Sequence, residues 1–141
     1  MMEEIRVGLI EEAHLTVDRQ MTADHIGSGS LQVFATPAMV AFVEQVCRRM
    51  ADDRLPEGQS TVGIRVDVRH RAPTPLGGQV RLRAEVTGFD GRQIEFQVQL
   101  WDQTELIGDA DHTRVIIDDA RFIKRVESKH CLLYTSPSPR D

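Results

Sequence analysis

Residues 33–44 read VFATPAMVAFVE, and they open the segment that decides the fold. From here apolar residues recur at helical spacing and form one stripe: Met39, Val40, Val43, Val46, Cys47 and Met50. Charged residues keep mostly to the other side of the helix: Arg48, Arg49, Asp52 and Asp53. The pattern predicts a single amphipathic helix with one buried face.

The second half of the chain alternates with period two, which indicates strands with one buried face. In TVGIRVDVRH (61–70) the apolar side carries Val62, Ile64, Val66 and Val68, and His70 falls on that side too. After APTPLGG (72–78), the alternation returns at Val80, Leu82, Ala84, Val86 and again at Ile94, Phe96, Val98, Leu100. Asp90-Gly91 between these two runs is a hairpin signal, so the two strands are expected to pair antiparallel. A further strand is expected from about residue 105 to 117.

The remaining segments complete a single α+β domain. A strand is expected within AHLTVDRQMT (13–22), and ARFIKRVESKH (120–130) is expected to end the chain as an edge segment or frayed terminus. One helix followed by four antiparallel strands, with no second helix to cover the other face, predicts a curved antiparallel sheet wrapped around a central helix. An open sheet of this kind often dimerises edge to edge, so a homodimer is expected.

Composition narrows the class of protein. The 141 residues carry 17 basic and 22 acidic side chains, a net charge of −5, without the basic stripe that nucleic acids require. No apolar run approaches the roughly 20 residues that cross a bilayer, and the N-terminus lacks a basic segment followed by an apolar one. We therefore expect a cytoplasmic protein with no nucleic-acid or membrane partner.

The last eleven residues, CLLYTSPSPRD (131–141), fit no periodic pattern. They resemble the conceptual translation of a sequencing-library adapter, as found at the ends of proteins from fragmentary metagenomic reads. We therefore expect a domain at 1–130 followed by a non-native tail at 131–141. Cys47 is then the one natural cysteine, which excludes an intrachain disulfide and fits a reducing compartment.

Three polar residues border the expected core. Thr36 before Pro37 is a favourable helix start, with Thr36 as the N-cap and Pro37 at the first helical position. Glu44 falls just beyond the edge of the apolar stripe, where helical geometry alone favours an exposed ion pair with Arg48. His70 ends the apolar face of its strand. If the three converge, a hydroxyl, a carboxylate and an imidazole beside a helix N-terminus form an acyl-transfer site.

Four ordered blocks carry a resemblance to a known family: FATPAMVAFVE (34–44), LPEGQSTVGIRVDVRHRAPTPLG (55–77), DGR (90–92) and IGDADHTR (107–114). They resemble the hot-dog-fold thioesterases of the fluoroacetyl-CoA thioesterase-like family. The resemblance implies hydrolysis of a small or medium acyl-CoA to free acid and CoA, with no cofactor besides the CoA of the substrate. It implies catalytic roles for Thr36, Glu44 and His70, and substrate contacts from the Gly63 backbone and from Arg114.

The chain departs from the family pattern in two places. Between Val17 and Leu31 there is no Phe, Tyr or Trp, where the fluoroacetyl-specific enzyme gates its pocket with Phe; the nearest aligned positions are Gly27 and Ser30. Fluoroacetyl specificity is therefore not expected. GDADHTR also replaces the more usual GEGTHER, with differences at Ala110 and Thr113, so the pocket near Arg114 is expected to differ.

Other functions stay open on the sequence. A hydratase or dehydratase of the same fold would carry an Asp and His pair, but Asp24 and His25 lie too far upstream to resemble it. A non-catalytic acyl-CoA sensor or carrier is the alternative from another class; the presence of Thr36, Glu44 and His70 together favours catalysis. The phosphates of CoA need cations, and Arg69, Arg71 and Arg81 are available, without an assigned site.

Overall fold

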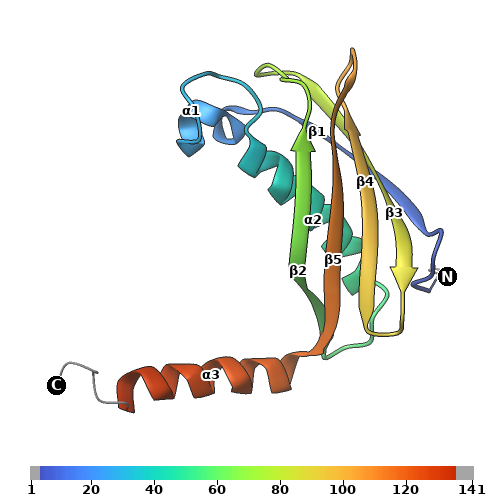
Figure 1. The fold of residues 1–141 in the computed structure, drawn as a ribbon, viewed down its shortest axis with the longest axis vertical. Coiled ribbons are helices and arrows are strands. Elements are labelled where there is room, and N and C mark those ends of the chain that lie inside the picture. The colour runs from blue at the N-terminus through green and yellow to red at the C-terminus, as the bar shows by residue number, and fades with distance from the viewer. Residues whose placement is uncertain (1–3, 136–141) are drawn as a thin grey trace.

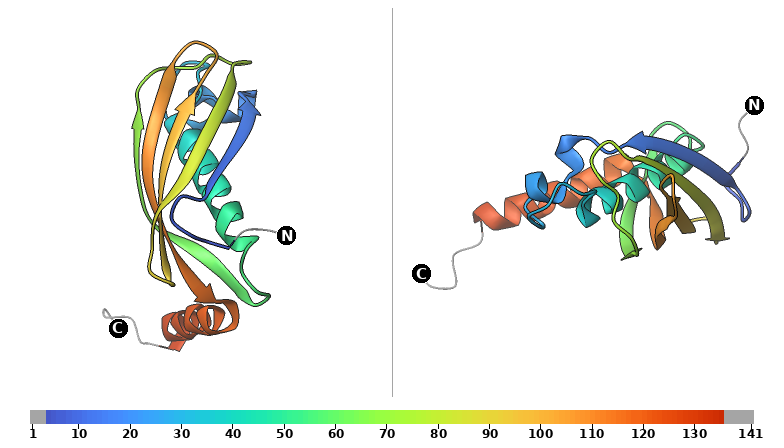
Figure 2. Two further views of the ribbon diagram at one scale, coloured as in Figure 1. Left: turned by 90° about the vertical axis from the view of Figure 1, so that its right-hand side faces the viewer. Right: turned by 90° about the horizontal axis from the view of Figure 1, so that it is seen from above.

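The computed structural model describes residues 4–135, which form a five-stranded antiparallel sheet curved around one long helix (Figure 1). The strand order is β1-β3-β4-β5-β2. The elements in chain order are β1 (Ile10–Thr16), the 3₁₀ turn η1 (Arg19–Met21), α1 (Ala23–Ile26), α2 (Thr36–Asp52), β2 (Gln59–His70), β3 (Gln79–Phe89), β4 (Gln93–Trp101), β5 (Leu106–Asp118) and α3 (Asp119–Thr135). The views from the side and from above show α2 lying in the concave face of the sheet (Figure 2). The predicted α+β architecture is confirmed.

The core lies between α2 and the sheet, because both present an apolar face at their own period. The buried face of α2 comprises Met39, Phe42, Val43, Val46, Cys47, Met50 and Ala51. The facing residues of β3 and β4 are the predicted ones, each at most 2% exposed: Val80, Leu82, Ala84, Val86, Ile94, Phe96, Val98 and Leu100. Complete burial of one such aliphatic or aromatic side chain contributes about 1.5–3 kcal/mol. The core therefore fixes both the sheet curvature and the orientation of α2.

The predicted hairpin between β3 and β4 is confirmed. Gly91 adopts a left-handed φ of 94°, and the Asp90 carboxylate accepts hydrogen bonds from the backbone N–H groups of Arg92 and Gln93 at 2.9 and 2.7 Å. Glycine tolerates this conformation without a Cβ clash, which is why the Asp-Gly pair predicts the turn.

A β-bulge in β2 corrects the predicted orientation of Ile64. The register with β5 shifts between Gly63 and Arg65, so the strand changes phase at Ile64. Thr61 is buried before the bulge, and Val66 pairs with the buried His112 after it. Ile64 is 56% exposed and Val66 is 38% exposed, so neither is buried as predicted. An extra residue in one strand displaces the alternation, which a strict period of two cannot anticipate.

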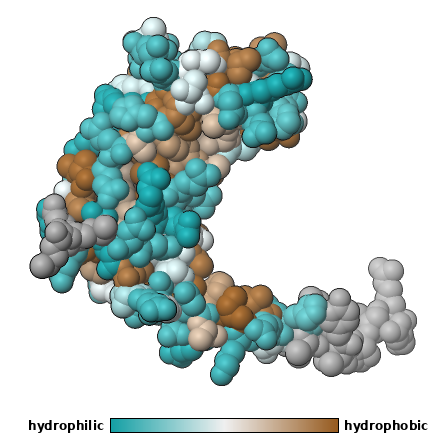
Figure 3. All heavy atoms as spheres, turned by 180° about the vertical axis from the view of Figure 1, so that it is seen from behind, coloured by the Kyte–Doolittle hydropathy of each residue, from teal (hydrophilic) through white to brown (hydrophobic). Residues whose placement is uncertain are grey.

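The segment 120–130 is helical, so its expected assignment as an edge segment or frayed terminus is wrong. The Asp118 carboxylate accepts from the Arg121 N–H at 3.0 Å and caps the start of α3. Its apolar residues Phe122, Ile123 and Val126 then recur at helical spacing. The helix does not cover the sheet: it projects from the end of β5, leaving a hollow between itself and the body (Figure 3). The prediction of one central helix therefore stands.

Two other boundaries differ from expectation. The first strand occupies Ile10–Thr16 instead of 13–22, because the chain turns into η1 after Thr16. The backbone of residues 131–135 continues α3, and residues 136–141 lie outside the described part, so the non-native origin of 131–141 stays a prediction. No helix among the described residues is long and apolar enough to cross a membrane.

Candidate active site

The first functional pair joins the start of α2 to the end of β2. Thr36 Oγ1 lies 2.8 Å from His70 Nδ1. Thr36 is not the N-cap that the sequence predicts: the cap is Ala35, without a side-chain hydrogen bond, and Thr36 is the first helical residue. Its hydroxyl is thereby free to face the histidine, and Pro37 still serves the first turn, where a missing N–H costs nothing.

His70 is held neutral and has one ring nitrogen to spare. Burial lowers the pKa of His70, with the Ala72 backbone acting in the opposite direction. The ring meets Phe34 edge-on, at a centroid separation of 6.4 Å. Its Nε2 is buried and has no hydrogen-bond partner among the described residues. A buried polar atom without a partner is uncommon, and its burial within the chain also closes Nε2 to a second molecule.

The second functional group surrounds Gly63 on β2. A Cβ built on Gly63 would lie 3.1 Å from Glu44 Oε2, 3.1 Å from His112 Cε1 and 3.4 Å from Arg114 Nη1. The missing side chain therefore leaves a gap enclosed by a carboxylate, an imidazole and a guanidinium. Gly63 is exposed, so this gap is open to solvent. Glycine is the residue that allows a ligand to approach the backbone this closely.

Glu44 faces this gap instead of pairing with Arg48. Arg48 bonds Asp52 at 3.2 Å, one turn further along α2. The half-buried Glu44 carboxylate makes no hydrogen bond or ion pair with the residues that the structure describes. The exposed ion pair favoured by helical geometry is therefore absent, and the carboxylate is left to interact with a ligand.

Arg114 is fixed in a buried position, 6% exposed. Its Nε donates to Thr61 Oγ1 at 2.7 Å and its Nη2 to the Thr61 carbonyl at 2.9 Å. Asp52 holds Thr61 in turn, accepting from its N–H at 3.0 Å and from its hydroxyl at 2.7 Å. Burial lowers the pKa of Arg114, and the nearby Asp52 opposes that shift; the guanidinium stays charged.

His112 completes the support of Arg114. Its Nε2 lies 3.2 Å from Arg114 Nη1 and its Nδ1 lies 2.7 Å from the Arg65 carbonyl. Because a guanidinium only donates, Nε2 must accept, so the imidazole is neutral and carries its proton on Nδ1. Burial is also the main cause that lowers the pKa of His112. Three of the five N–H groups of Arg114 are thus engaged within the protein, and one on each Nη remains for a ligand oxygen.

The two groups are separate within one chain. Glu44 follows Thr36 by two helical turns, about 12 Å along the axis, and Gly63 and His70 are about 23 Å apart along β2. Sequence reasoning expected Thr36, Glu44 and His70 to converge. The structure instead joins Thr36 with His70, and Glu44 with Gly63 and Arg114.

Several supporting residues escaped the sequence analysis. Thr61, Asp52 and His112 were not assigned roles. His112 and Arg114 are two residues apart and lie on one face of β5, so the spacing alone could have predicted that they are neighbours. The cations considered for CoA are engaged elsewhere. Arg69 and Arg71 both bond Asp109, and Arg81 bonds Glu12 while its guanidinium lies 4.2 Å from the centre of the Trp101 ring.

Comparison with known proteins places this geometry in a family. The family model described as fluoroacetyl-CoA-specific thioesterase matches residues 17–120. The chain belongs to this family. The fluoroacetyl-CoA thioesterase of Streptantibioticus cattleyicolor is 34% identical over 98 residues, which cover 70% of each chain. A solved structure of a fluoroacetyl-CoA thioesterase superposes with a TM-score of 0.83 at 29% identity, covering 90% of this chain and 98% of that one.

Two further structures support the fold of this family member. A thioesterase superfamily member from Thermus thermophilus has a TM-score of 0.80 at 26% identity, covering 91% and 97% of the two chains. A hot-dog-like protein from Thermanaerovibrio acidaminovorans has a TM-score of 0.82 at 24% identity, covering 87% and 91%, which bears on the fold alone. The predicted hot-dog fold, family and thioester-hydrolase class are confirmed.

Proposed function

We propose that this family member hydrolyses small or medium acyl-CoA thioesters with Thr36, His70 and Glu44 as its catalytic group. The observation that carries the proposal is the contact between Thr36 Oγ1 and His70 Nδ1 at 2.8 Å. A hydroxyl bonded to a neutral imidazole is the arrangement of an activated nucleophile.

The chemistry follows from the tautomer of His70. To accept the Thr36 proton, Nδ1 must be unprotonated, so Nε2 carries the hydrogen. The ring lies beside the Ala72 backbone, which raises the pKa of His70 against the larger effect of burial, and the Glu44 carboxylate makes no hydrogen bond with the residues that the structure describes. Glu44 would stabilise by its negative charge the imidazolium that forms.

Pairing two copies of the chain would bring the Thr36–His70 pair of one copy close to the Glu44 carboxylate of the other. β2 is an edge strand, bonded on one side to β5, and Ile64 and Val66 on it are 56% and 38% exposed. An antiparallel pairing of two β2 edges about a two-fold axis near Val66 and Asp67 would set Gly63 of one copy opposite His70 of the other. A homodimer of this kind would contain two complete sites, each with Thr36 and His70 from one copy and Glu44, Gly63 and Arg114 from the other.

The gap beside Gly63, Glu44 and Arg114 would receive the thioester carbonyl. The Thr36 oxygen attacks the carbonyl carbon while His70 takes its proton, and the free N–H groups of Arg114 stabilise the oxyanion in the gap at Gly63. The C–S bond then breaks, and CoA leaves as the thiol with the proton from His70. Water, activated by the same imidazole, releases the acid from Thr36. These residues supply every proton and charge that the reaction needs, so no cofactor is proposed besides the CoA of the substrate.

The acyl specificity and the compartment are part of the same proposal. The segment between Val17 and Leu31 carries no Phe, Tyr or Trp, so the pocket would accept other small or medium acyl groups rather than select fluoroacetyl. A lone natural cysteine, Cys47, fits the reducing cytoplasm.

Thiol release from acetyl, butyryl, decanoyl, benzoyl, phenylacetyl and fluoroacetyl-CoA tests the activity, using a chain that ends at His130. We expect hydrolysis that falls at least about 100-fold in both Glu44→Gln and His70→Ala. CoA esters that raise the melting temperature without any thiol release would instead support the sensor or carrier function.

Mixing the two inactive variants tests the shared site. If the halves come from different copies, a heterodimer of Glu44→Gln with His70→Ala has one unaltered site, and activity returns on mixing. If all three residues act within one chain, every site keeps a defect and mixing restores nothing. Sedimentation equilibrium of each variant confirms that the dimer is intact.

A further inference from the structure

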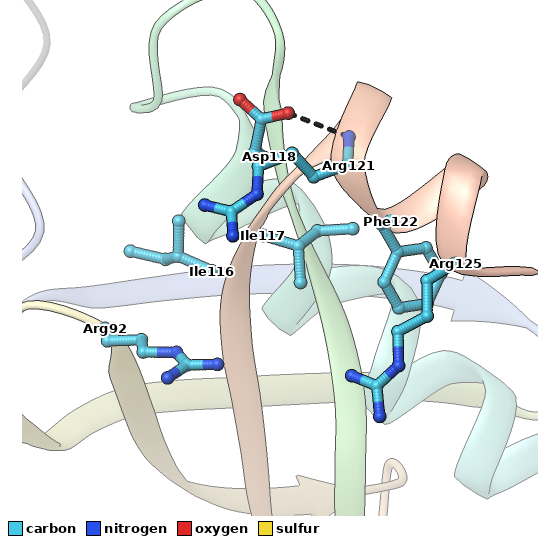
Figure 4. Close-up of a pocket in the computed structure, with 7 residues that line it drawn as sticks. All are labelled: Arg92, Ile116, Ile117, Asp118, Arg121, Phe122 and Arg125. Atoms are coloured by element: carbon cyan, nitrogen blue, oxygen red, sulfur yellow. Dashed lines mark hydrogen bonds between the residues drawn. The ribbon is translucent and has the colours of Figure 1, made fainter.

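A cluster of cations lies at the other end of the molecule from Thr36. Arg92 from the β3–β4 turn and Arg121 and Arg125 from α3 line a hollow of about 510 Å³ around the end of β5. Figure 4 shows the three side chains placed around this strand end, with Phe122 beside Arg125. Asp118, the remaining charged residue of the lining, is the cap of α3.

These three guanidinium groups differ from the other arginines considered for CoA. Arg69, Arg71 and Arg81 are each tied to a carboxylate. Among residues 4–130, no carboxylate forms an ion pair with Arg92, Arg121 or Arg125; Asp90 is near enough to Arg92 for its pKa to be lowered slightly by that charge, after the larger effect of backbone N–H groups. In a chain with a net charge of −5, three such cations in one hollow favour an anionic ligand.

The hollow also has an apolar wall. Ile116, Ile117 and the half-buried Phe122 line it together with the cations. An aromatic face beside guanidinium groups suits a nucleobase that carries phosphates, because the base stacks and the phosphates accept bidentate hydrogen bonds.

The position matches the proposed reaction. Ile116, Ile117 and Asp118 follow Arg114 directly on β5, about 7–13 Å along the strand. An extended pantetheine arm covers that distance, so a ligand anchored here can place its sulfur at the gap beside Gly63 and Arg114.

We propose that this arginine hollow binds the 3′-phosphorylated adenosine diphosphate end of the CoA substrate. The inference rests on the proposed function, because it assigns the nucleotide subsite of that same reaction. Arg92, Arg121 and Arg125 bind the phosphates, and Phe122 packs on the adenine. Two of the three cations and the aromatic residue come from α3, outside the matched family segment 17–120.

Kinetics with two forms of one thioester test the assignment. In Arg92→Gln and Arg125→Gln we expect KM for the acyl-CoA to rise about 10-fold each, the usual effect of losing one charge-assisted hydrogen bond, with kcat unchanged. The same acyl group on N-acetylcysteamine, which lacks the nucleotide, should be hydrolysed equally by wild type and variants. Lys124→Gln is the matched control, since this cation lies on α3 without lining the hollow. Equal KM values for acyl-CoA in all four proteins would overturn the proposal.

Calorimetry separates this proposal from the catalytic one, because it needs no turnover. We expect CoA and 3′,5′-ADP to bind, dephospho-CoA to bind more weakly, and both arginine variants to lose affinity. CoA binding that is unchanged in the variants would refute the hollow even in an active enzyme. Inorganic phosphate that binds as tightly as 3′,5′-ADP would show a simple phosphate site and would also refute it.

Discussion

The hydroxyl of Thr61 offers the sharpest test of the buried network, because one atom serves two charged partners. It donates to the Asp52 carboxylate at 2.7 Å and accepts from Arg114 Nε at 2.7 Å. Thr61→Val preserves the shape and removes both bonds, whereas Thr61→Ser keeps the hydroxyl and is the matched control. Hydrogen bonds to charged groups contribute about 1.5–3 kcal/mol each.

We expect Thr61→Val to lose about 3 kcal/mol of unfolding free energy, since the two bonds share one atom and the Arg114 N–H is left buried and unpaired. Urea unfolding at one fixed protein concentration measures this, because a dimer has a concentration-dependent stability. The melting temperature should fall by roughly 10 °C, and kcat/KM by about 10-fold as Arg114 loosens. If Thr61→Val and Thr61→Ser unfold within about 0.5 kcal/mol of each other, the network does not hold Arg114.

Gly63, the buried imidazoles and Cys47 can each be tested separately. Gly63→Ala should lower kcat/KM by at least about 10-fold, because its Cβ would occupy the gap, 3.1 Å from Glu44 and from His112. Unchanged thiol release would show that substrate does not enter the gap. Burial lowers the pKa of His70 and His112 below the ordinary 6.5. Between pH 7 and 5 the unfolded chain therefore binds more protons than the folded chain, and the unfolding free energy should fall on acidification. An unfolding free energy from urea that does not change over this pH range would contradict neutral buried imidazoles. Burial raises the pKa of the Cys47 thiol to about 12. In a chain ending at His130, a thiol reagent should therefore label Cys47 only as fast as the whole protein unfolds. Rapid labelling of the native protein would be inconsistent with this burial.

Local sequence patterns correctly predicted those elements whose buried face depends on hydrophobic periodicity alone. The helical stripe of α2 and the alternation of β3 and β4 predicted their buried faces, because burial follows directly from period. Asp90-Gly91 predicted its hairpin for a backbone reason that needs no tertiary context. The wrong predictions fall where a single residue interrupts the hydrophobic pattern. The bulge at Ile64 shifts the inward and outward alternation of β2, and the Asp118 cap starts the helix α3.

The candidate site was only partly readable in the same way. The resemblance named Thr36, Glu44, His70, Gly63 and Arg114, and the structure brings Thr36 onto His70 and Glu44 to the gap at Gly63. It also shows what the motifs did not predict: Asp52 and Thr61 brace Arg114, and His112 must be neutral. A hydrogen bond between β2 and the end of α2 depends on packing, which spacing along the chain does not encode.

The sequence by itself determined the α+β class, the apolar faces and the family, because periodicity and ordered motifs are local properties of the chain. The tertiary structure decided which polar groups meet. It paired the Thr36 hydroxyl with His70 instead of the helix N-cap, set Glu44 apart from that pair, and gathered Arg92, Arg121 and Arg125 around one strand end. Such meetings are fixed by the curvature of the sheet around α2 and by a bulge and a cap, and these exist only once distant segments have packed.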